Sequence, residues 1–302
     1  MSRIIARLDI KDTQLVKGIQ FEGLRKYGNV KNFVEKYYNY GLHELFMTDV
    51  MASLYGRNRL GDMIDNFSKN CRIPITAGGG IIDIETSKDL LLKGADKVSI
   101  NSALFNSIDI IKDLSNIYGS QAIVISIQAR KKTDSPGWHV MKNAGRSYTG
   151  VDLEEWLNIL SKYNFGEILI SSIDYDGTCE GIDKALLKKV VEYSHCPVIY
   201  SGGIKEKSDI DDVFKLGASA ACIGAALHKG ILGHNELKNF SLISNRKKIN
   251  DTPKEFFKSI NCIILDLDLG NTGSLKYALE EAGCNVKLSS EKSDIIDADI
   301  LW

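Results

Sequence analysis

The sequence lacks several features that would assign it to a specialised class of protein. Its 302 residues carry 38 basic and 39 acidic side chains, a formal net charge of −1, so the general attraction that drives most nucleic-acid binding is missing. No apolar run approaches the roughly 20 residues of a membrane span. Arg3, Arg7 and Asp9 interrupt the amino terminus, unlike a signal peptide. We therefore expect a cytoplasmic chain with no nucleic-acid or membrane partner.

Metal-binding patterns are also missing. The six cysteines are scattered, with no CxxC pair, and several lie in apolar runs where a free thiol acts as a small hydrophobe. The five histidines show no metal-ligand spacing. We expect reduced thiols, no metal site and no cofactor. The composition, 44% hydrophobic and 25% charged, excludes disorder, collagen and coiled coil.

The chain instead contains an alternation of two patterns. Short β-rich runs occupy residues 4–9, 45–49, 74–76, 97–100, 122–127, 167–172, 197–201 and 221–224. Between them, apolar residues recur at helical spacing over 29–40, 85–93, 108–118, 153–163, 184–193 and 208–216. Eight strands alternating with helices predict an α/β fold with a parallel sheet closed into a (β/α)8 TIM barrel, whose active site lies at the carboxyl ends of the strands.

An internal repeat divides this barrel in two. Pro74 and Pro197, like Gly79 and Gly202, are separated by 123 residues, and the same offset relates residues 43–50 to 166–173. We therefore expect two half-barrels of four β/α units, with equivalent ligand sites on opposite sides of one mouth.

Glycines follow one strand in each half, at 78–80 and at Gly202 and Gly203. Without Cβ atoms, their backbone N–H groups can approach a phosphate. A tight strand-to-helix turn would also explain them. Their duplicated placement beside other strand ends favours two phosphate sites, which would suit an elongated bisphosphate. The residues expected to form them are Gly80, Asn101, Ser102, Gly177, Gly202, Gly203, Gly224 and Ala225.

Carboxylates also follow the strands. Asp9 ends the first strand, Asp49 the second, and Asp176 lies after Ser171 in the loop of the sixth. Carboxylates at the carboxyl ends of barrel strands are more often catalytic or substrate-binding than structural. Lys17 in the first loop could clamp an anion or be a solvated loop charge. We expect all five to contribute to the site.

Together the segments IIARLDIKD, TDVMAS, AGGGI, GADKVSIN, GEILISSIDYDGT and SGGI resemble the cyclase subunit of imidazole glycerol phosphate synthase, HisF, collinearly from Arg3 to about His228. The resemblance implies an enzyme that uses ammonia from a partner glutaminase to split and cyclise a bisphosphorylated ribulosyl-formimino aminoimidazole carboxamide ribonucleotide. The products would be imidazole glycerol phosphate, an intermediate of histidine biosynthesis, and the aminoimidazole carboxamide ribonucleotide. Two aspartates would serve as general acid and base, and Asp9 matches the first.

The second position departs from the family pattern. Gln128 stands where the family has aspartate on the fifth strand. An amide can orient a substrate but cannot exchange protons near neutral pH. Because general acid–base catalysis contributes about 10²–10⁴-fold, we expect impaired cyclase turnover, which Gln128→Asp would restore if only this acid group is missing.

Four charges match the family's ammonia gate at the bottom of the barrel: Arg3, Glu44, Lys97 and Glu167. They could alternatively form a structural salt-bridge plug. Their presence beside the missing aspartate raises a second hypothesis, in which the chain conducts ammonia between a glutaminase and a sugar amidotransferase that makes acetamidino sugars for surface polysaccharides. A barrel that binds a phosphorylated metabolite without chemistry is a third.

The chain exceeds a typical barrel of roughly 250 residues. We predict the barrel over 1–243, a polar linker over 244–260 and the start of another α/β domain over 261–302. This last segment resembles the first β-α-β of a class I glutaminase, although Leu267 and Leu269 depart from the family's turn. It ends before the residues that such a glutaminase needs for catalysis. Cys262 and Cys284 lie outside a nucleophile-elbow pattern, so no glutamine hydrolysis is expected of this chain.

Overall fold

The computed structural model describes residues 2–52, 60–70, 73–238, 240, 260–265, 272, 275–276, 279–280, 283–291, 293–294 and 300–301. Cys71, nearly all of the predicted linker 244–260, and the turn at Leu267 and Leu269 lie outside these residues. Among the helices in the described ranges, none is long and apolar enough to cross a membrane.

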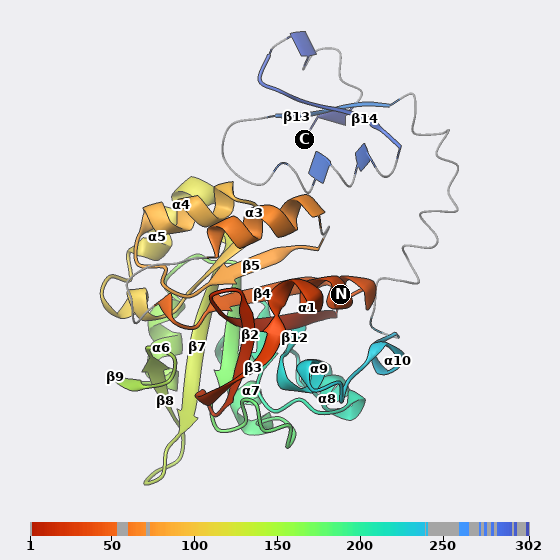
Figure 1. The fold of residues 1–302 in the computed structure, drawn as a ribbon. Coiled ribbons are helices and arrows are strands. Elements are labelled where there is room, and N and C mark those ends of the chain that lie inside the picture. The colour runs from red at the N-terminus through yellow and green to blue at the C-terminus, as the bar shows by residue number, and fades with distance from the viewer. Residues whose placement is uncertain are drawn as a thin grey trace.

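Eight parallel strands form a closed barrel, as the sequence predicted (Figure 1). Each pairs with the next along the chain, and β12 pairs with β1 to complete the circle. In chain order they are β1 (Arg3–Lys11), β4 (Glu44–Asp49), β5 (Ile75–Gly78), β6 (Lys97–Ile100), β7 (Ile123–Lys131), β10 (Glu167–Ser172), β11 (Val198–Ser201) and β12 (Ala220–Ile223).

Helices surround this barrel (Figure 1). All six predicted helices are present: α1 (Val30–Asn39), α4 (Ile84–Leu92), α5 (Ile110–Tyr118), α6 (Leu153–Leu160), α7 (Lys184–Tyr193) and α8 (Lys207–Lys215). The sequence did not predict α3 (Gly61–Asn70), the single-turn helices α9 (Ala225–His228) and α10 (His234–Leu237), or the 3-10 turns η1 (Ser102–Phe105) and η2 (Ser120–Ala122). Asn29, Asp83 and Asp183 begin α1, α4 and α7 by accepting a backbone N–H with their side chains.

An antiparallel hairpin follows the first strand of each half. Strands β2 (Gln14–Ile19) and β3 (Glu22–Asn29) follow β1, whereas β8 (Trp138–Lys142) and β9 (Ser147–Asp152) follow β7. Both therefore extend a barrel strand beyond its carboxyl end, toward the mouth.

Strand register makes the two halves directly comparable. Asp9 in β1 lies opposite Thr48 in β4, and Gln128 in β7 lies opposite Ser171 in β10. The 123-residue repeat relates Thr48 to Ser171, so Asp9 and Gln128 occupy equivalent positions. Two residues earlier on each strand, Arg7 lies opposite Phe46 and Ser126 lies opposite Leu169. The 123-residue repeat relates Phe46 to Leu169, so Arg7 and Ser126 are also equivalent.

The barrel interior contains a small apolar cluster separate from the core between strands and helices. Its members, all buried, are Ile5, Phe46, Val124, Leu169, Ile199, Ala220 and Cys222. On β1, Ile5 lies between Arg3 at the start of the strand and Arg7 nearer its end. Side chains on one face of a strand alternate, so this layer separates the charged bottom of the barrel from the polar mouth.

The described residues beyond 260 include three more strands. Strand β13 (Asn261–Leu265) pairs in parallel with β14 (Asn285–Ser289) and with β15 (Ile300–Leu301), giving the order β14-β13-β15. Described residues at 275–276 and 279–280 are helical. Two parallel strands with helical residues between them are the arrangement of a β-α-β unit.

Candidate functional site

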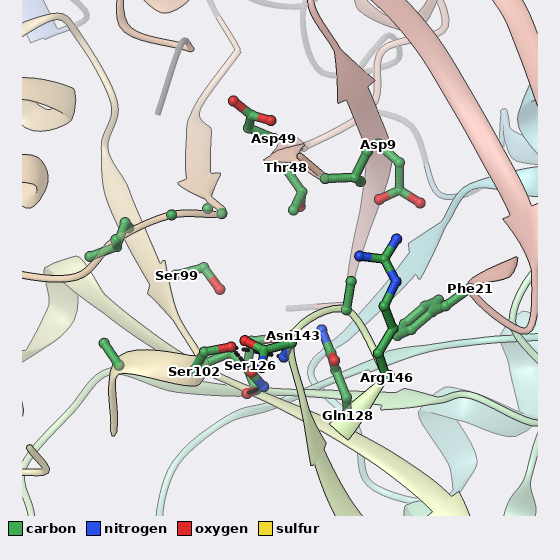
Figure 2. A pocket seen from close by; sticks show the side chains of 18 of the residues that line it. Asp9, Phe21, Thr48, Asp49, Ser99, Ser102, Ser126, Gln128, Asn143 and Arg146 are labelled. Carbon is green, nitrogen blue, oxygen red and sulfur yellow. Dashed lines mark hydrogen bonds between the residues drawn. The ribbon is translucent and has the colours of Figure 1, made fainter. Parts of the chain in front are cut away.

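A cavity of about 240 Å³ opens at the carboxyl ends of β4, β5, β6 and β7. Figure 2 shows Asp9 and Gln128 on facing sides of it. Predicted site residues among those that line it are Asp9, Asp49, Gly80, Asn101, Ser102, Gln128 and Asp176. The structure therefore brings both members of the expected acid–base pair to one cavity in the mouth.

A second, narrower cavity lies at the ends of β10, β11 and β12. Its lining includes the predicted residues Asp176, Gly177, Gly202, Gly203, Gly224 and Ala225. Asp176 lines both cavities, and among the residues that the structure describes no other does so. The two sets of glycines that the repeat relates thus lie in separate cavities, one in each half of the barrel.

Two glycines show why these turns exclude a side chain. Gly80 has a φ of +66°, and an added Cβ would collide with the Ala52 methyl group. Gly203 has a φ of +78°, and its Cβ would collide with the backbone carbonyl oxygen of Gly181. L-residues adopt this left-handed conformation at a cost, so both turns depend on glycine.

Four charged side chains at the two cavities form a continuous chain. Arg7 Nε donates to Asp9 Oδ1 (3.0 Å), and Lys17 Nζ donates to Asp9 Oδ2 (2.7 Å). Lys17 Nζ also donates to Asp176 Oδ1 (2.9 Å). All four are buried. Charges alternate along Arg7–Asp9–Lys17–Asp176, here termed the charge chain, and each buried ion has an opposite neighbour.

The charge chain fixes the ionisation of Asp9. Burial alone would raise the pKa of this carboxyl group, but the Arg7 and Lys17 cations lower it well below its usual range. The two cations therefore favour the carboxylate form of Asp9, which accepts a hydrogen bond from each of them.

Lys17 and Ser171 are not among the residues that line the cavities. Lys17 lies beneath the mouth in the charge chain, and the Ser171 hydroxyl accepts a hydrogen bond from Arg7 Nη1 (3.0 Å). Lys17 and Ser171 therefore contribute to the site by bonding to its charged side chains and do not line either cavity.

Gln128 holds the turn between β8 and β9 over the first cavity. Its Oε1 accepts the backbone N–H of Gly145 (2.8 Å), and Ser102 Oγ accepts that of Asn143 (3.0 Å). An added Cβ at Gly145 would lie 2.8 Å from the Phe21 ring in the turn between β2 and β3. The two hairpins therefore meet above the mouth, one contributed by each half.

At the bottom of the barrel, the four predicted gate residues form a closed ring. Arg3 pairs with Glu44 (3.0 Å) and with Glu167, and Lys97 pairs with Glu44 (3.2 Å) and Glu167 (2.7 Å). Burial opposes ionisation of Glu167, but Lys97 and Arg3 lower its pKa below the usual range. The ring is consistent with both hypotheses for these residues, a gate and a structural plug.

Sequence reasoning missed several residues of the mouth. Phe21, Asn143 and Arg146 line the first cavity from the two hairpins, and Arg146 points toward Asp9 (Figure 2). Arg7 is the most consequential omission. It shares one face of β1 with Arg3 and Asp9, since alternate residues of a strand point the same way, and this period-two pattern could have identified it.

No cluster of three or more histidine, cysteine or acidic residues in the described ranges could hold a metal ion. In these ranges Cys179, Cys196, Cys222, Cys262 and Cys284 are free thiols.

Comparison with known proteins gives one consistent result. A family profile described as "Histidine biosynthesis protein" matches residues 3–233. The imidazole glycerol phosphate synthase subunit HisF of Legionella pneumophila is 45% identical over 202 residues, covering 67% of this chain and 95% of the relative. HisF of Prochlorococcus marinus (strain MIT 9215) is 40% identical over 255 residues, covering 84% and 98% respectively. HisF of Petrotoga mobilis is 38% identical over 236 residues, covering 78% and 94%.

Proposed function

Because the chain belongs to the HisF family of imidazole glycerol phosphate synthase subunits, we propose that its barrel performs the cyclase reaction of histidine biosynthesis. In this reaction ammonia splits the bisphosphorylated aminoimidazole carboxamide ribonucleotide and the imidazole ring closes. Imidazole glycerol phosphate and the aminoimidazole carboxamide ribonucleotide are released. Asp9 and the two cavities provide the site for this chemistry.

The placement of the two cavities is the observation that carries the proposal. Each half of the barrel presents a glycine turn and a short helix or 3-10 turn beginning at Ser102 or Ala225. Backbone N–H groups at such positions favour phosphate oxygens. A substrate with a phosphate at each end would place its central portion over Asp9 and Asp176, since Asp176 borders both cavities.

Ammonia would enter at the opposite end of the barrel. We assign the ring of Arg3, Glu44, Lys97 and Glu167 as the entrance, to which a glutaminase subunit or domain of the HisH type would dock. Between this ring and the mouth, the interior is lined by the small apolar cluster. Ammonia is neutral and passes such a layer more easily than ammonium, because burying an unpaired cation is costly.

The segment after residue 260 supports a glutaminase partner. Its parallel strands β13 and β14 have the order expected for the first β-α-β of a class I glutaminase domain. We propose that residues 261–302 are related to that domain and that the barrel ends near residue 243.

The second hypothesis, ammonia transfer to a sugar amidotransferase, is not favoured by the comparisons. The relatives reported above are all named as subunits of imidazole glycerol phosphate synthase. It would regain support if the barrel bound the ribonucleotide but released no product.

The direct test supplies purified protein with the bisphosphorylated ribonucleotide and an ammonium salt at alkaline pH, and measures imidazole glycerol phosphate. We expect slow, ammonium-dependent formation of both products, which Asp9→Asn lowers further because the site loses its carboxylate. Folded protein that binds the substrate and forms no product would overturn the proposal. Lys31→Met, on the exposed surface of α1, serves as the control substitution.

A further inference from the structure

Arg7 is a buried cation that the proposed chemistry does not use. Its side chain starts on β1, where Nε donates to Asp9, and its Nη1 donates to Ser171 Oγ (3.0 Å) and Ser201 Oγ (3.2 Å). In the sheet, β12 lies between β1 and β11, and β10 lies beyond. The side chain therefore crosses the barrel interior from the first half into the second.

Hydrogen bonds and stacking fix this position. The two serine hydroxyls and one carboxylate oxygen accept from the guanidinium group, and its carbon lies 5.3 Å from the centre of the Phe21 ring. Planar stacking and multiple directed donors suit arginine and not lysine. The guanidinium group is therefore held on Asp9 by the Phe21 ring and by serines of β10 and β11 in the second half.

Both carboxylate oxygens of Asp9 are occupied by cations. Arg7 takes Oδ1 and Lys17 takes Oδ2. Lys17 alone would leave Oδ1 open toward the cavity, where a substrate could donate or receive a proton. In the equivalent place of the second half, Ser126 stands two residues before Gln128 and brings no charge.

We propose that Arg7 is a positioning residue that holds Asp9 as a fixed carboxylate. Both members of the acid–base pair have then lost proton exchange in this barrel: Asp9 because Arg7 pairs with it, and position 128 because it is a glutamine. This inference rests on the proposed function for the identity of the pair. It changes the expectation for Gln128→Asp, because that substitution alone would restore only one partner.

The groups facing Asp9 come from several elements. Arg7 lies on β1, Lys17 on β2 and Asp176 in the loop after β10, and Arg146 reaches toward it from the turn between β8 and β9 (Figure 2). The Cys222 thiol on β12 is neutral, because burial raises its pKa to about 12. Arg7 and Lys17 are the cations that touch the carboxylate, and Arg7 can be removed while Lys17 still pairs with Asp176.

The test compares four proteins: the unsubstituted chain, Gln128→Asp, Arg7→Ser, and the double variant Arg7→Ser with Gln128→Asp. Serine is the residue that the second half carries at the equivalent position. Arg25→Ser, which removes an exposed arginine of β3, is the matched control. Thermal melting verifies that each protein is folded. Arg7→Gln, which removes the charge and keeps hydrogen-bonding capacity, replaces Arg7→Ser if that variant does not fold.

Ammonium-dependent turnover is measured across pH 5–9. We expect Gln128→Asp alone to gain less than about tenfold and the double variant to gain about 10²–10⁴-fold, the usual contribution of general acid–base catalysis. In variants without Arg7, turnover should also decrease toward the acidic end of this pH range, whereas the other proteins should show no such decrease. If Gln128→Asp alone gives the full gain and removal of Arg7 adds nothing, the inference is wrong.

A second measurement does not depend on turnover. The carboxyl carbon of Asp9 is followed by ¹³C NMR in aspartate-labelled protein, with its signal assigned by its loss in Asp9→Asn. We expect a flat signal from pH 4.5 to 8 in the unsubstituted chain and in Arg25→Ser, and a titration within this range in Arg7→Ser. Titration without turnover in any variant would refute the cyclase assignment and leave the role of Arg7 intact. A flat signal in folded Arg7→Ser or Arg7→Gln would refute the role of Arg7.

Discussion

The two halves of the barrel share a backbone plan and differ in where they place charge. Each begins with a long strand that continues into an antiparallel hairpin, and each has a glycine turn after its third barrel strand that faces the mouth. The first half presents Asp9 between two cations, whereas the second presents the neutral Gln128, bonded to a backbone N–H. The ring at the barrel bottom shows the same bias, since both of its cations come from the first half.

This difference indicates that duplication preserved the geometry of ligand binding while the chemistry of each half changed separately. Backbone turns recognise a phosphate through N–H groups, so side-chain changes elsewhere leave them intact. A buried charge, by contrast, requires partners from neighbouring strands. Four sets of substitutions test how charges and turns contribute in the two halves.

The largest effect is expected at the equivalent pair Asp9 and Gln128. Asp9→Asn should lower the free energy of unfolding by about 3–5 kcal/mol, because it leaves Arg7 and Lys17 without their shared anion. Gln128→Ala should cost about 1–3 kcal/mol, the penalty of leaving the buried Gly145 N–H without an acceptor. Urea denaturation at pH 7 measures both. Equal losses would show that the charge chain does not distinguish the halves.

A second contrast lies where the halves join. Phe105 stacks on Trp156 with ring centres 4.5 Å apart, and the 123-residue repeat relates this pair to His228 and Phe33, 5.9 Å apart. The His228 Nδ1 also lies 2.6 Å from the Tyr37 hydroxyl. Burial, and then the nearby Lys17, lower the pKa of His228 to about 3. One junction is therefore acid-sensitive and the other is not.

Below pH 6.5 the unfolded chain binds a proton at His228 that the folded chain does not. The free energy of unfolding should therefore fall as pH decreases from 6.5 toward 3, by up to about 1.4 kcal/mol per pH unit. His228→Gln keeps a hydrogen-bond acceptor for Tyr37 and should reduce this slope, while Phe105→His should steepen it. Urea midpoints at pH 7 and 4.5 measure the effect, and identical slopes in the three proteins would contradict it.

The two glycine turns should differ in tolerance. Gly203→Ala forces a methyl group against a backbone carbonyl, whereas Gly80→Ala meets the Ala52 side chain first. We expect a loss of about 2–3 kcal/mol in the free energy of unfolding for Gly203→Ala and about 1–2 kcal/mol for Gly80→Ala, in the range of left-handed strain. Thermal melts compare them, and a more stable Gly203→Ala would reverse the order.

The smallest effect is expected at the ring. Lys97→Met removes two ion pairs whose lysine side chain is 19% exposed, and we expect a loss of about 1 kcal/mol that decreases with added salt. Lys31→Met removes an exposed pair with Glu35 and should cost nearly nothing. A loss above about 3 kcal/mol for Lys97→Met would be the cost of a fully buried pair and would favour the structural-plug hypothesis.

Much of the barrel follows from local patterns. The eight strands and six helices have apolar spacing that needs no tertiary information, and each predicted helix is present. The hairpin of β2 and β3 was missed because most residues of β3, such as Arg25, are polar and exposed, so no alternation of buried and exposed residues marks it. Helix α3 was missed although its periodicity resembles that of the others.

The sequence predicted which residues belong to the site more completely than it predicted which of them contact one another. Asp9, Gln128 and the glycine turns were found from motifs, and the structure assigns them to cavities of the mouth. The sequence contained Arg7 two residues before Asp9, but its partners Ser171 and Ser201 are 164 and 194 residues away. No local pattern joins them.

By itself, the sequence determined the barrel, its division into two halves and its family. Strand period, repeat spacing and motif order are local or linear patterns that can be recognised without tertiary contacts. Only the tertiary structure decided what Asp9 can do. Whether a carboxylate exchanges protons depends on the groups within a few ångströms. Closure of the barrel brings Ser171 and Ser201 to Arg7, and Asp176 to Lys17, and these contacts hold both cations against Asp9.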